Sequence, residues 1–264
     1  MVEDGIKACA MEVSSIGIEQ KRVDSIKFDV AMYTNLTHDH LDYHGNMHEY
    51  FLAKKKFFDS LSSEAVAITN IDDEYGLKMV EDTKAHVYTY GTSQDADYRA
   101  TDIKLESHRT SFVLKYRERS LLITTNLVAM FNVYNLLAVL AALDQTGYDL
   151  ENILSKLGDL ESVSGRMHRI DIGQNYNVIV DFAHTPDGLE KVFEYAKAIT
   201  PKENKIISVF GSAGRRDIIK RKIFGELADK YCDMIILTED DPRDENPLEI
   251  AQEIAKGIHK KQYL

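Results

Sequence analysis

Apolar runs alternate with helical segments through the last third of the chain, and this alternation constrains the fold more than any other feature. The apolar runs have the length and β-branched content of buried strands, and they are Val178–Phe182, Ile206–Phe210 and Met234–Thr238. The segments that follow them have helical spacing and cover 186–199, 218–231 and 247–258. A β-α-β-α-β-α order predicts a parallel sheet with helices on its faces.

Polar side chains follow each of these three predicted strands. Asp181 and His184 lie at the exit of the first strand, Gly211–Arg216 follows the second, and Asp240–Arg243 follows the third. In open α/β sheets, ligands bind in the crevice outside the carboxyl ends of the strands. We therefore expect a ligand site along this edge of the sheet.

The first 160 residues predict a larger, mixed arrangement. Predicted strands cover 6–13, 28–34, 65–69, 86–90, 98–105, 109–116 and 120–124, and the last three are expected to be antiparallel because short polar turns separate them. Predicted helices cover 47–61, 127–147 and 150–157, and a linker is expected at 158–166. The predicted fold class is α/β, with a mixed sheet followed by a parallel sheet.

The composition limits the class of protein. The chain has 264 residues, of which 44% are hydrophobic, and its formal net charge of -11 argues against a non-specific nucleic-acid binder without excluding a local phosphate site. Cys9 and Cys232 lie far apart in apolar surroundings, so we expect reduced core thiols and a cytoplasmic protein. No apolar run is long enough to predict a membrane span, and the acidic start does not resemble a signal peptide. The sequence sets no oligomeric state.

The stretch Thr34–Leu61 joins a histidine-rich loop to a lysine-bearing helix. Lys54 falls beside the apolar face of that helix, whereas Lys55 and Lys56 are expected to face solvent. Acids, imidazoles and a lysine in this order predict a centre for a cation and a phosphate. The alternative is a polar loop before a surface helix, with Lys54 extending its amine to water.

Two loops after predicted strands carry candidate ligand groups. Gly211–Arg216 (GSAGRR) lies between a strand and a helix, where glycines and a helix N-terminus favour an anion, although a plain glycine turn is the alternative. It is not the phosphate loop G-x-x-x-x-G-K-[ST], which occurs nowhere in this sequence. Asp240–Arg243 (DDPR) offers acids for an ammonium and an arginine for a carboxylate, so it predicts a zwitterion site, with an exposed helix entry as the alternative.

Eight motifs, in this order and spacing, resemble those of the Mur ligase family. They are MEVSS-x-G-x-x-Q-x-R (Met11–Arg22), TNL-x-x-DHLDYHG (Thr34–Gly45), Y-x-x-AK (Tyr50–Lys54), FNVYN (Phe131–Asn135), GRM (Gly165–Met167), D-x-AHTPD-x-LEK (Asp181–Lys191), G-x-x-G-x-RD-x-x-KR (Gly211–Arg221) and DDPR-x-E-x-P (Asp240–Pro247). They span nearly the whole chain, and their combination is far more specific than any one of them. The resemblance is greatest to family members that add the third peptide residue of the cell-wall precursor.

The resemblance implies two domains. Residues 1–160 resemble part of the family's central ATP-binding domain, and residues 161–264 resemble part of its Rossmann-like C-terminal ligase domain. The family's phosphate loop, its amino-terminal UDP-binding domain and the end of its last domain have no counterpart in this sequence. We therefore expect that this polypeptide alone does not catalyse ligation.

The resemblance also implies roles for individual residues. Glu12, His40 and Lys54 resemble magnesium ligands, with Lys54 as the lysine that becomes carbamylated. Residues that resemble contacts to the UDP-linked substrate are Ser14, Gln20 and Arg22. Asn132 and Arg166 resemble ATP contacts, and Asp181 and His184 belong to the motif that lines the nucleotide cleft. Those that resemble the amino-acid site are Arg216, Asp240, Asp241, Pro242 and Arg243. Catalytic roles are implied for Lys54, His40, Arg166 and His184.

The implied reaction is ATP-dependent amide formation through an acyl phosphate, with ATP and Mg²⁺ as cofactors. The implied substrates are UDP-MurNAc-L-Ala-D-Glu and a diamino acid. Arg243 favours meso-diaminopimelate over L-lysine because it offers a partner for the distal carboxylate, although Asp241 stands where such family members typically carry Asn. The alternatives are a folylpolyglutamate synthetase-like ligase, a Mur-like subunit acting with an amidotransferase, and a non-catalytic Mur-like binding subunit.

Overall fold

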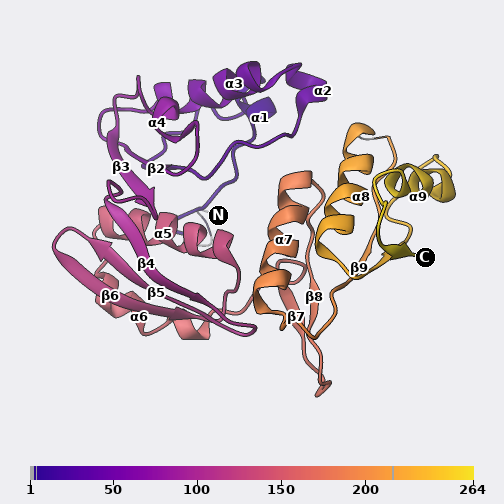
Figure 1. Cartoon of the computed structure of the whole chain (residues 1–264). Coiled ribbons are helices and arrows are strands. Elements are labelled where there is room, and N and C mark those ends of the chain that lie inside the picture. The colour runs from indigo at the N-terminus through magenta and orange to yellow at the C-terminus, as the bar shows by residue number, and fades with distance from the viewer. Residues whose placement is uncertain (1–2, 4, 216) are drawn as a thin grey trace.

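The largest element of the fold is a six-stranded mixed sheet in the order β1-β2-β3-β4-β5-β6. The computed structural model describes residues 3, 5–215 and 217–264 (Figure 1). The strands of this sheet are β1 (Val30–Tyr33), β2 (Val66–Asn70), β3 (His86–Gly91), β4 (Tyr98–Leu105), β5 (Thr110–Tyr116) and β6 (Arg119–Thr125). Neighbours from β1 to β4 pair in parallel, and β4, β5 and β6 pair antiparallel, so the predicted mixed sheet is confirmed.

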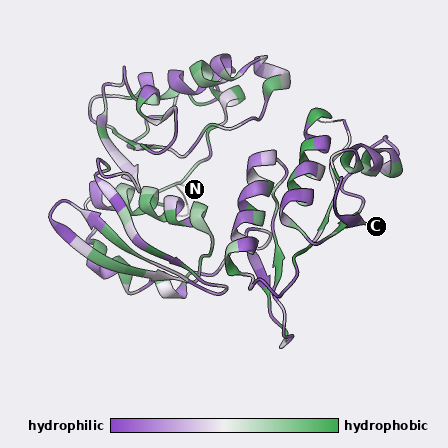
Figure 2. Cartoon of the chain, in the orientation of Figure 1, coloured by the Kyte–Doolittle hydropathy of each residue, from purple (hydrophilic) through white to green (hydrophobic). Residues whose placement is uncertain are grey.

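Different helices cover the two faces of this sheet. In β2, Ala67 belongs to the core beneath α3 (Met47–Asp59), whereas Ile68 belongs to the core beneath α5 (Met130–Gln145). Both side chains are fully buried, because successive residues of a strand point to opposite faces. Figure 2 shows hydrophobic and hydrophilic residues interleaved along the strands and a more hydrophobic stretch along α5. The first strands of the sheet therefore lie between two helical layers, whereas, of these two cores, β4, β5 and β6 contribute only to the one on the α5 side.

Asp72, in the turn after β2, ties this layer together. Its carboxylate accepts hydrogen bonds from the backbone N–H and the hydroxyl of Thr92, at 2.6 and 2.7 Å, and from the N–H of Ser93 at 3.1 Å. The hydroxyl groups of Ser93 and of Tyr134, which lies on α5, donate to the same carboxylate. One side chain thus joins the end of β2 to the end of β3 and to a helix.

The second half of the chain forms two smaller sheets. Their strands are β7 (His168–Ile170), β8 (Val178–Val180), β9 (Ile207–Phe210), β10 (Met234–Leu237) and β11 (Gln262–Tyr263). β9, β10 and β11 form the predicted parallel sheet, in the order β11-β10-β9. The prediction that β8 belongs to it is wrong, because the backbone of β8 pairs antiparallel with β7, a strand that the sequence does not predict. A cavity of about 500 Å³, lined by residues of both β8 and β9, lies between these two strands.

Three helices pack side by side against this smaller sheet (Figure 1). They are α7 (Pro186–Ile199), α8 (Ile219–Tyr231) and α9 (Pro247–Ala255). Each lies within one of the helices predicted at 186–199, 218–231 and 247–258. Gly225 and Gly257 let α8 and α9 approach closely. A Cβ at Gly225 would lie 2.0 Å from the carbonyl oxygen of Ile254, and one at Gly257 would lie 2.2 Å from that of Lys222.

Several short elements complete the chain. They are α1 (Ser15–Glu19), α2 (Leu41–His44), α4 (Gly76–Met79), α6 (Leu150–Leu154) and the 3-10 helix η1 (Leu157–Asp159). The sequence predicts neither α1 nor α2 nor α4, because one helical turn is too short to show a period. None of the described helices has the length and apolar character needed to cross a membrane.

The predicted strand at residues 6–13 does not form. This segment is largely exposed, and among the described strands β1 pairs with β2 alone, so no ladder satisfies the backbone of residues 6–13. Cys9 is exposed with it, so the prediction of a core thiol is wrong there. Cys232 is buried, as predicted.

The two halves of the chain touch through a small apolar cluster. Val128 and Ala129, just before α5, pack against Met167 and against Tyr195 of α7. The hydroxyl of Tyr195 also donates to the carbonyl oxygen of Glu106 at 2.8 Å. The start of α5 and the segment around residue 167 are therefore held together.

Candidate active site

Lys54 lies on α3 with its amine partly buried beside two carboxylates. Burial lowers the pKa of Lys54, and the negative charges of Glu12 and Asp39 oppose that lowering. The Nζ atom lies 5.4 Å from the centre of the Tyr50 ring, one turn earlier on the same helix. The structure therefore places Glu12 and Lys54, two of the predicted metal ligands, within electrostatic reach of each other.

The prediction that Lys55 faces solvent is wrong. Lys55 is buried rather than facing solvent, and its ammonium binds Asp59 at 2.7 Å and Asp82 at 2.6 Å. Asp82 comes from the segment after α4, which the sequence does not place beside α3. Lys56 is exposed, as predicted, and lies 3.3 Å from Glu19. The three consecutive lysines 54–56 therefore lie in three different environments.

His40, the third predicted metal ligand, also packs against the ring of Tyr50. Its ring meets the Tyr50 ring edge-on, with 6.0 Å between centres, and its Nε2 atom lies 3.5 Å from an oxygen of Asp39. The backbone of His40 is left-handed, with φ of 54°, which turns the chain into α2. Asp39 is therefore a member of the site that the residue-by-residue prediction of metal ligands missed, although its place next to His40 was a signal.

The donor chemistry of this group suits a hard cation. Mg²⁺ prefers oxygen ligands and usually binds one or two carboxylates together with substrate phosphates and water. Among the residues that the structure describes, no three His, Cys, Asp or Glu side chains converge as a metal cluster. Glu12 and Asp39 supply oxygens, and a carbamate on Lys54 would add another in place of a repelling ammonium. The residues present therefore fit the ion if Lys54 is carbamylated.

The residues predicted to contact the UDP-linked substrate gather at the two ends of α1. Ser14 caps this helix, and its hydroxyl accepts the N–H of Gly17 at 3.1 Å. Gln20 ends the helix, and both Gln20 and Arg22 are exposed. Below them, Ser15 is buried and its Oγ lies 2.8 Å from Nε2 of His44.

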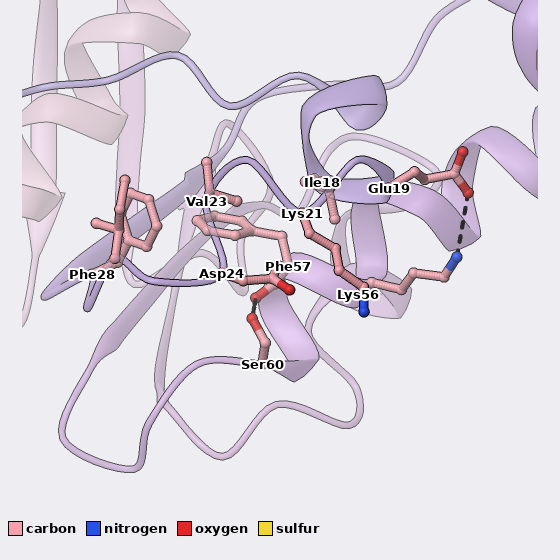
Figure 3. A pocket seen from close by; sticks show the side chains of 10 residues that line it. Ile18, Glu19, Lys21, Val23, Asp24, Phe28, Lys56, Phe57 and Ser60 are labelled. Carbon is pink, nitrogen blue, oxygen red and sulfur yellow. Dashed lines mark hydrogen bonds and ion pairs between the residues drawn. The ribbon is translucent and has the colours of Figure 1, made fainter.

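A cavity lies next to α1, but Lys54 is not among the residues that line it. It has a volume of about 510 Å³ and is lined by α1, the loop after it and the last turns of α3 (Figure 3). The side chains of Glu19 and Lys56 pair at its rim, and Phe57 forms part of its wall. None of the predicted site residues lines it, so it does not unite them.

The nucleotide-binding prediction involves two neighbouring segments. Asn132 lies in the first turn of α5, and its Nδ2 donates to the carbonyl oxygen of Val128 at 2.7 Å. The guanidinium of Arg166 is exposed and lies 5.2 Å from the centre of the Phe182 ring. Both segments adjoin the cluster of Val128, Ala129, Met167 and Tyr195, so the start of α5 and the loop of Arg166 lie on the same side of the molecule.

Asp181 orders the loop that carries Arg166 and His184. Its two carboxylate oxygens accept the N–H groups of Met167 and Ala183, each at 2.8 Å. Asp181 therefore holds the loop rather than offering a free carboxylate. The ring of His184 is exposed, and its Nδ1 lies 3.2 Å from the carbonyl oxygen of Phe182.

The residues predicted to bind the amino acid lie on two touching loops. Gly214 donates its N–H to the carbonyl oxygen of Asp241 at 3.0 Å. Arg243 is exposed, with its Nε 3.6 Å from a carboxylate oxygen of Asp241. Asp240 is exposed and Pro242 is partly buried. Arg216, also predicted here, lies outside the described residues.

One contact joins the histidine-rich loop to the second half of the chain. Nε2 of His38 lies 3.1 Å from an oxygen of Asp217, which follows the glycine loop in sequence. These residues are 179 positions apart. The loop that carries His40 and the loop before α8 are therefore neighbours, a proximity that no local pattern predicts.

Comparison with known proteins identifies the family. Family models match residues 1–143, as the Mur ligase middle domain, and residues 165–263, as the Mur ligase, glutamate ligase domain. A UDP-N-acetylmuramoyl-L-alanyl-D-glutamate–2,6-diaminopimelate ligase of Syntrophomonas wolfei is 41% identical over 252 residues, which are 95% of this chain and 51% of that protein.

Solved structures agree with this assignment. A diaminopimelate ligase of the same name superposes with a TM-score of 0.66 at 33% identity, over 96% of this chain and 53% of its own. A folylpolyglutamate synthase of Thermotoga maritima superposes with a TM-score of 0.66 at 15% identity, over 89% of this chain and 53% of its own, which shows a shared fold alone. The chain spans about half the length of the curated relatives it matches. By its sequence and its fold, the chain belongs to the Mur ligase family.

Proposed function

We propose that this chain is part of an ATP-dependent ligase that adds a diamino acid to UDP-MurNAc-L-Ala-D-Glu. The observation that carries the proposal is the 41% identity, over 95% of the chain, with a protein named for that reaction. The two loops that end in Gly214 and Arg243 support it, because they bring an arginine and several acids to one place. The fold shared with folylpolyglutamate synthase favours no second function, because the identity there is 15%.

The proposed reaction has two steps. A carboxylate oxygen of the dipeptide attacks the γ-phosphorus of ATP, which forms an acyl phosphate and releases ADP. The amine of the diamino acid then attacks the acyl carbon, forms the amide and expels phosphate, while the amine loses a proton. Such chemistry depends mainly on positioning the reactants and on neutralising phosphate charge.

Lys54, Glu12, Asp39 and His40 form the proposed cation centre. Reaction of a lysine with CO₂ requires the neutral amine, and burial lowers the pKa of Lys54 in that direction. When bound there, Mg²⁺ would neutralise phosphate charge. Arg166 and Asn132 are proposed to contact the nucleotide, and both lie beside the segment that Asp181 orders.

The proposed amino-acid substrate is meso-diaminopimelate. Arg243 is exposed and carries the fork that binds a carboxylate through two hydrogen bonds, so it suits the distal carboxylate that L-lysine lacks. Asp241 lies 3.6 Å from Arg243 and competes for the same guanidinium. The preference for diaminopimelate is therefore expected to be finite rather than absolute.

The test is a ligation assay on the gene product that contains this chain. ATP and UDP-MurNAc-L-Ala-D-Glu are supplied with either meso-diaminopimelate or L-lysine, and phosphate release and the product mass are measured. We expect the diaminopimelate product to form at the higher kcat/KM. Absence of amide product with both amino acids refutes the proposal, and a higher kcat/KM for L-lysine refutes the assigned specificity. The 264-residue chain assayed alone is the control, and we expect no product from it because it contains no G-x-x-x-x-G-K-[ST] segment.

A further inference from the structure

Two loops at neighbouring strand ends, Gly211–Arg215 and Asp240–Glu245, are clasped together. Besides the bond between Gly214 and Asp241, the side chain of Arg215 binds the carboxylate of Asp244, with Nε 2.7 Å from one oxygen. Glycine is required at 214, because a Cβ there would lie 2.1 Å from the carbonyl oxygen of Pro242. The two backbones are thus in direct contact.

Glu245 contacts both the glycine loop and a buried arginine of α8. One of its carboxylate oxygens accepts the backbone N–H of Arg215, and the other accepts Nη1 of Arg221 at 2.9 Å. Arg221 is 1% exposed and also binds Glu253 of α9 at 2.7 Å and the carbonyl oxygen of Ala213 at 3.4 Å. A buried guanidinium therefore anchors Glu245, and Glu245 in turn anchors the glycine loop.

The two loops contain residues other than glycine in the left-handed region of backbone conformation. Arg215, Asp241 and Arg243 have positive φ values of 54°, 41° and 54°. The left-handed region costs a residue with a Cβ about 1–2 kcal/mol, so such conformations survive where surrounding contacts hold them. The bonds from Glu245 to the N–H of Arg215 and to Arg221 are contacts of this kind.

We propose that Glu245, held by Arg221, is a positioning residue for recognition of the diamino acid. It fixes the backbone immediately before residue 216 and aligns that backbone with the Asp240–Arg243 loop, without itself binding the amino acid. The inference rests on the proposed function. It predicts that affinity for the diamino acid depends on the carboxylate of Glu245, although both of its oxygens accept hydrogen bonds from groups of the protein itself.

Two variants separate positioning from a merely structural role. Glu245→Gln keeps the size of the side chain but leaves one acceptor oxygen for two donors, so either the backbone N–H of Arg215 or the guanidinium of Arg221 loses its bond to residue 245. Glu253→Gln is the matched control, because it removes a carboxylate from the same buried guanidinium but belongs to α9 rather than to either loop. Both variants are expected to lower the unfolding temperature.

The steady-state assay is expected to distinguish them. In the ligase, Glu245→Gln should raise KM for meso-diaminopimelate about tenfold, with KM for ATP within about twofold of wild type, as loss of one charged hydrogen bond in a positioning role implies. Glu253→Gln should leave both KM values within about twofold. An unchanged KM in Glu245→Gln, or an equal rise in Glu253→Gln, overturns the proposal.

Amide exchange on the 264-residue chain decides the inference even if no ligation is found. The N–H of Arg215 should exchange about tenfold faster in Glu245→Gln than in wild type, because its acceptor is weakened, and about as in wild type in Glu253→Gln. Equal exchange of this N–H in both variants shows that Glu245 does not hold the loop. A ligase that makes no product while Glu245 still protects the N–H would refute the proposed function and, with it, the recognition role.

Discussion

The substitution Asp72→Asn is expected to destabilise the six-stranded part of the molecule. The carboxylate of Asp72 accepts hydrogen bonds from Thr92 and Ser93, which directly follow β3, and from Tyr134 of α5. Burial raises the pKa of Asp72, but the hydrogen bonds from Ser93, Thr92 and Tyr134 outweigh it and lower the pKa from 3.8 to about 2. An amide keeps the shape of the side chain but has one acceptor oxygen and no charge, so several of these donors lose their partner.

The size of the effect follows from the pKa. A lowering from 3.8 to about 2 corresponds to about 2.4 kcal/mol at 1.36 kcal/mol per pH unit. Asp72 is exposed, so solvent screening reduces this figure, and we expect a loss of about 1 kcal/mol in the free energy of unfolding at neutral pH.

The pH dependence has a definite sign. Because the pKa of Asp72 is lower in the folded chain than in the unfolded chain, its contribution is present above pH 3.8 and is lost as the pH falls toward about 2. The difference between wild type and Asp72→Asn should therefore be full at neutral pH and shrink below about pH 4.

Urea unfolding followed by circular dichroism measures this difference, since the chain has no tryptophan. Titrations at about pH 7, 5 and 3 cover the relevant range. Asp95→Asn is the matched control, because Asp95 is an exposed acid near the same turn and makes no hydrogen bond within the described part of the chain. Equal stability of wild type and Asp72→Asn at pH 7, or a difference that persists undiminished at about pH 3, would refute the reasoning.

Three further substitutions test other features. Gly214→Ala places a Cβ 2.1 Å from a carbonyl oxygen of the opposite loop and should cost about 2 kcal/mol in urea unfolding, whereas Gly158→Ala, in open space, should stay within about 0.5 kcal/mol. Lys55→Ala should cost about 1–3 kcal/mol because it leaves two carboxylates without their buried partner, and Lys56→Ala should be nearly neutral. Lys54→Arg cannot form a carbamate, so a ¹³C carbamate signal seen in wild type under labelled bicarbonate should vanish and ligation should fall by at least about 100-fold; a persisting signal would place the carbamate elsewhere.

Elements with a clear period could be predicted from the sequence. The predicted helix at 186–199 is α7 with the same bounds, and the predicted strand at 98–105 is β4 with the same bounds. Both are long for their type, and α7 carries an apolar pattern of helical spacing, whereas the alternation of β4 shifts by one residue at the bulge between Thr101 and Lys104. The partner of β8 was not predictable, because β7 has only three residues, which are too few to show an alternating pattern.

The site was predictable only where chemistry and sequence position coincide. Lys54 could be assigned a partly buried place because it lies between apolar neighbours on one helix. The burial of Lys55 depends on Asp82, which reaches it from 27 positions away, and no helical period reports that contact. Likewise, Glu245 is one acid among many in the sequence, and its role emerges only when Arg221 and Arg215 lie beside it.

The open side of β9 has a consequence for handling this protein. β9 is one of the two edge strands of the three-stranded sheet, and its Ile207 and Val209 are 57% and 62% exposed. An apolar edge strand is a template on which an extended segment of another molecule can add by backbone pairing. We therefore expect self-association through this strand, so that the turbidity of solutions of the chain rises with concentration. The substitution Val209→Lys should reduce that turbidity.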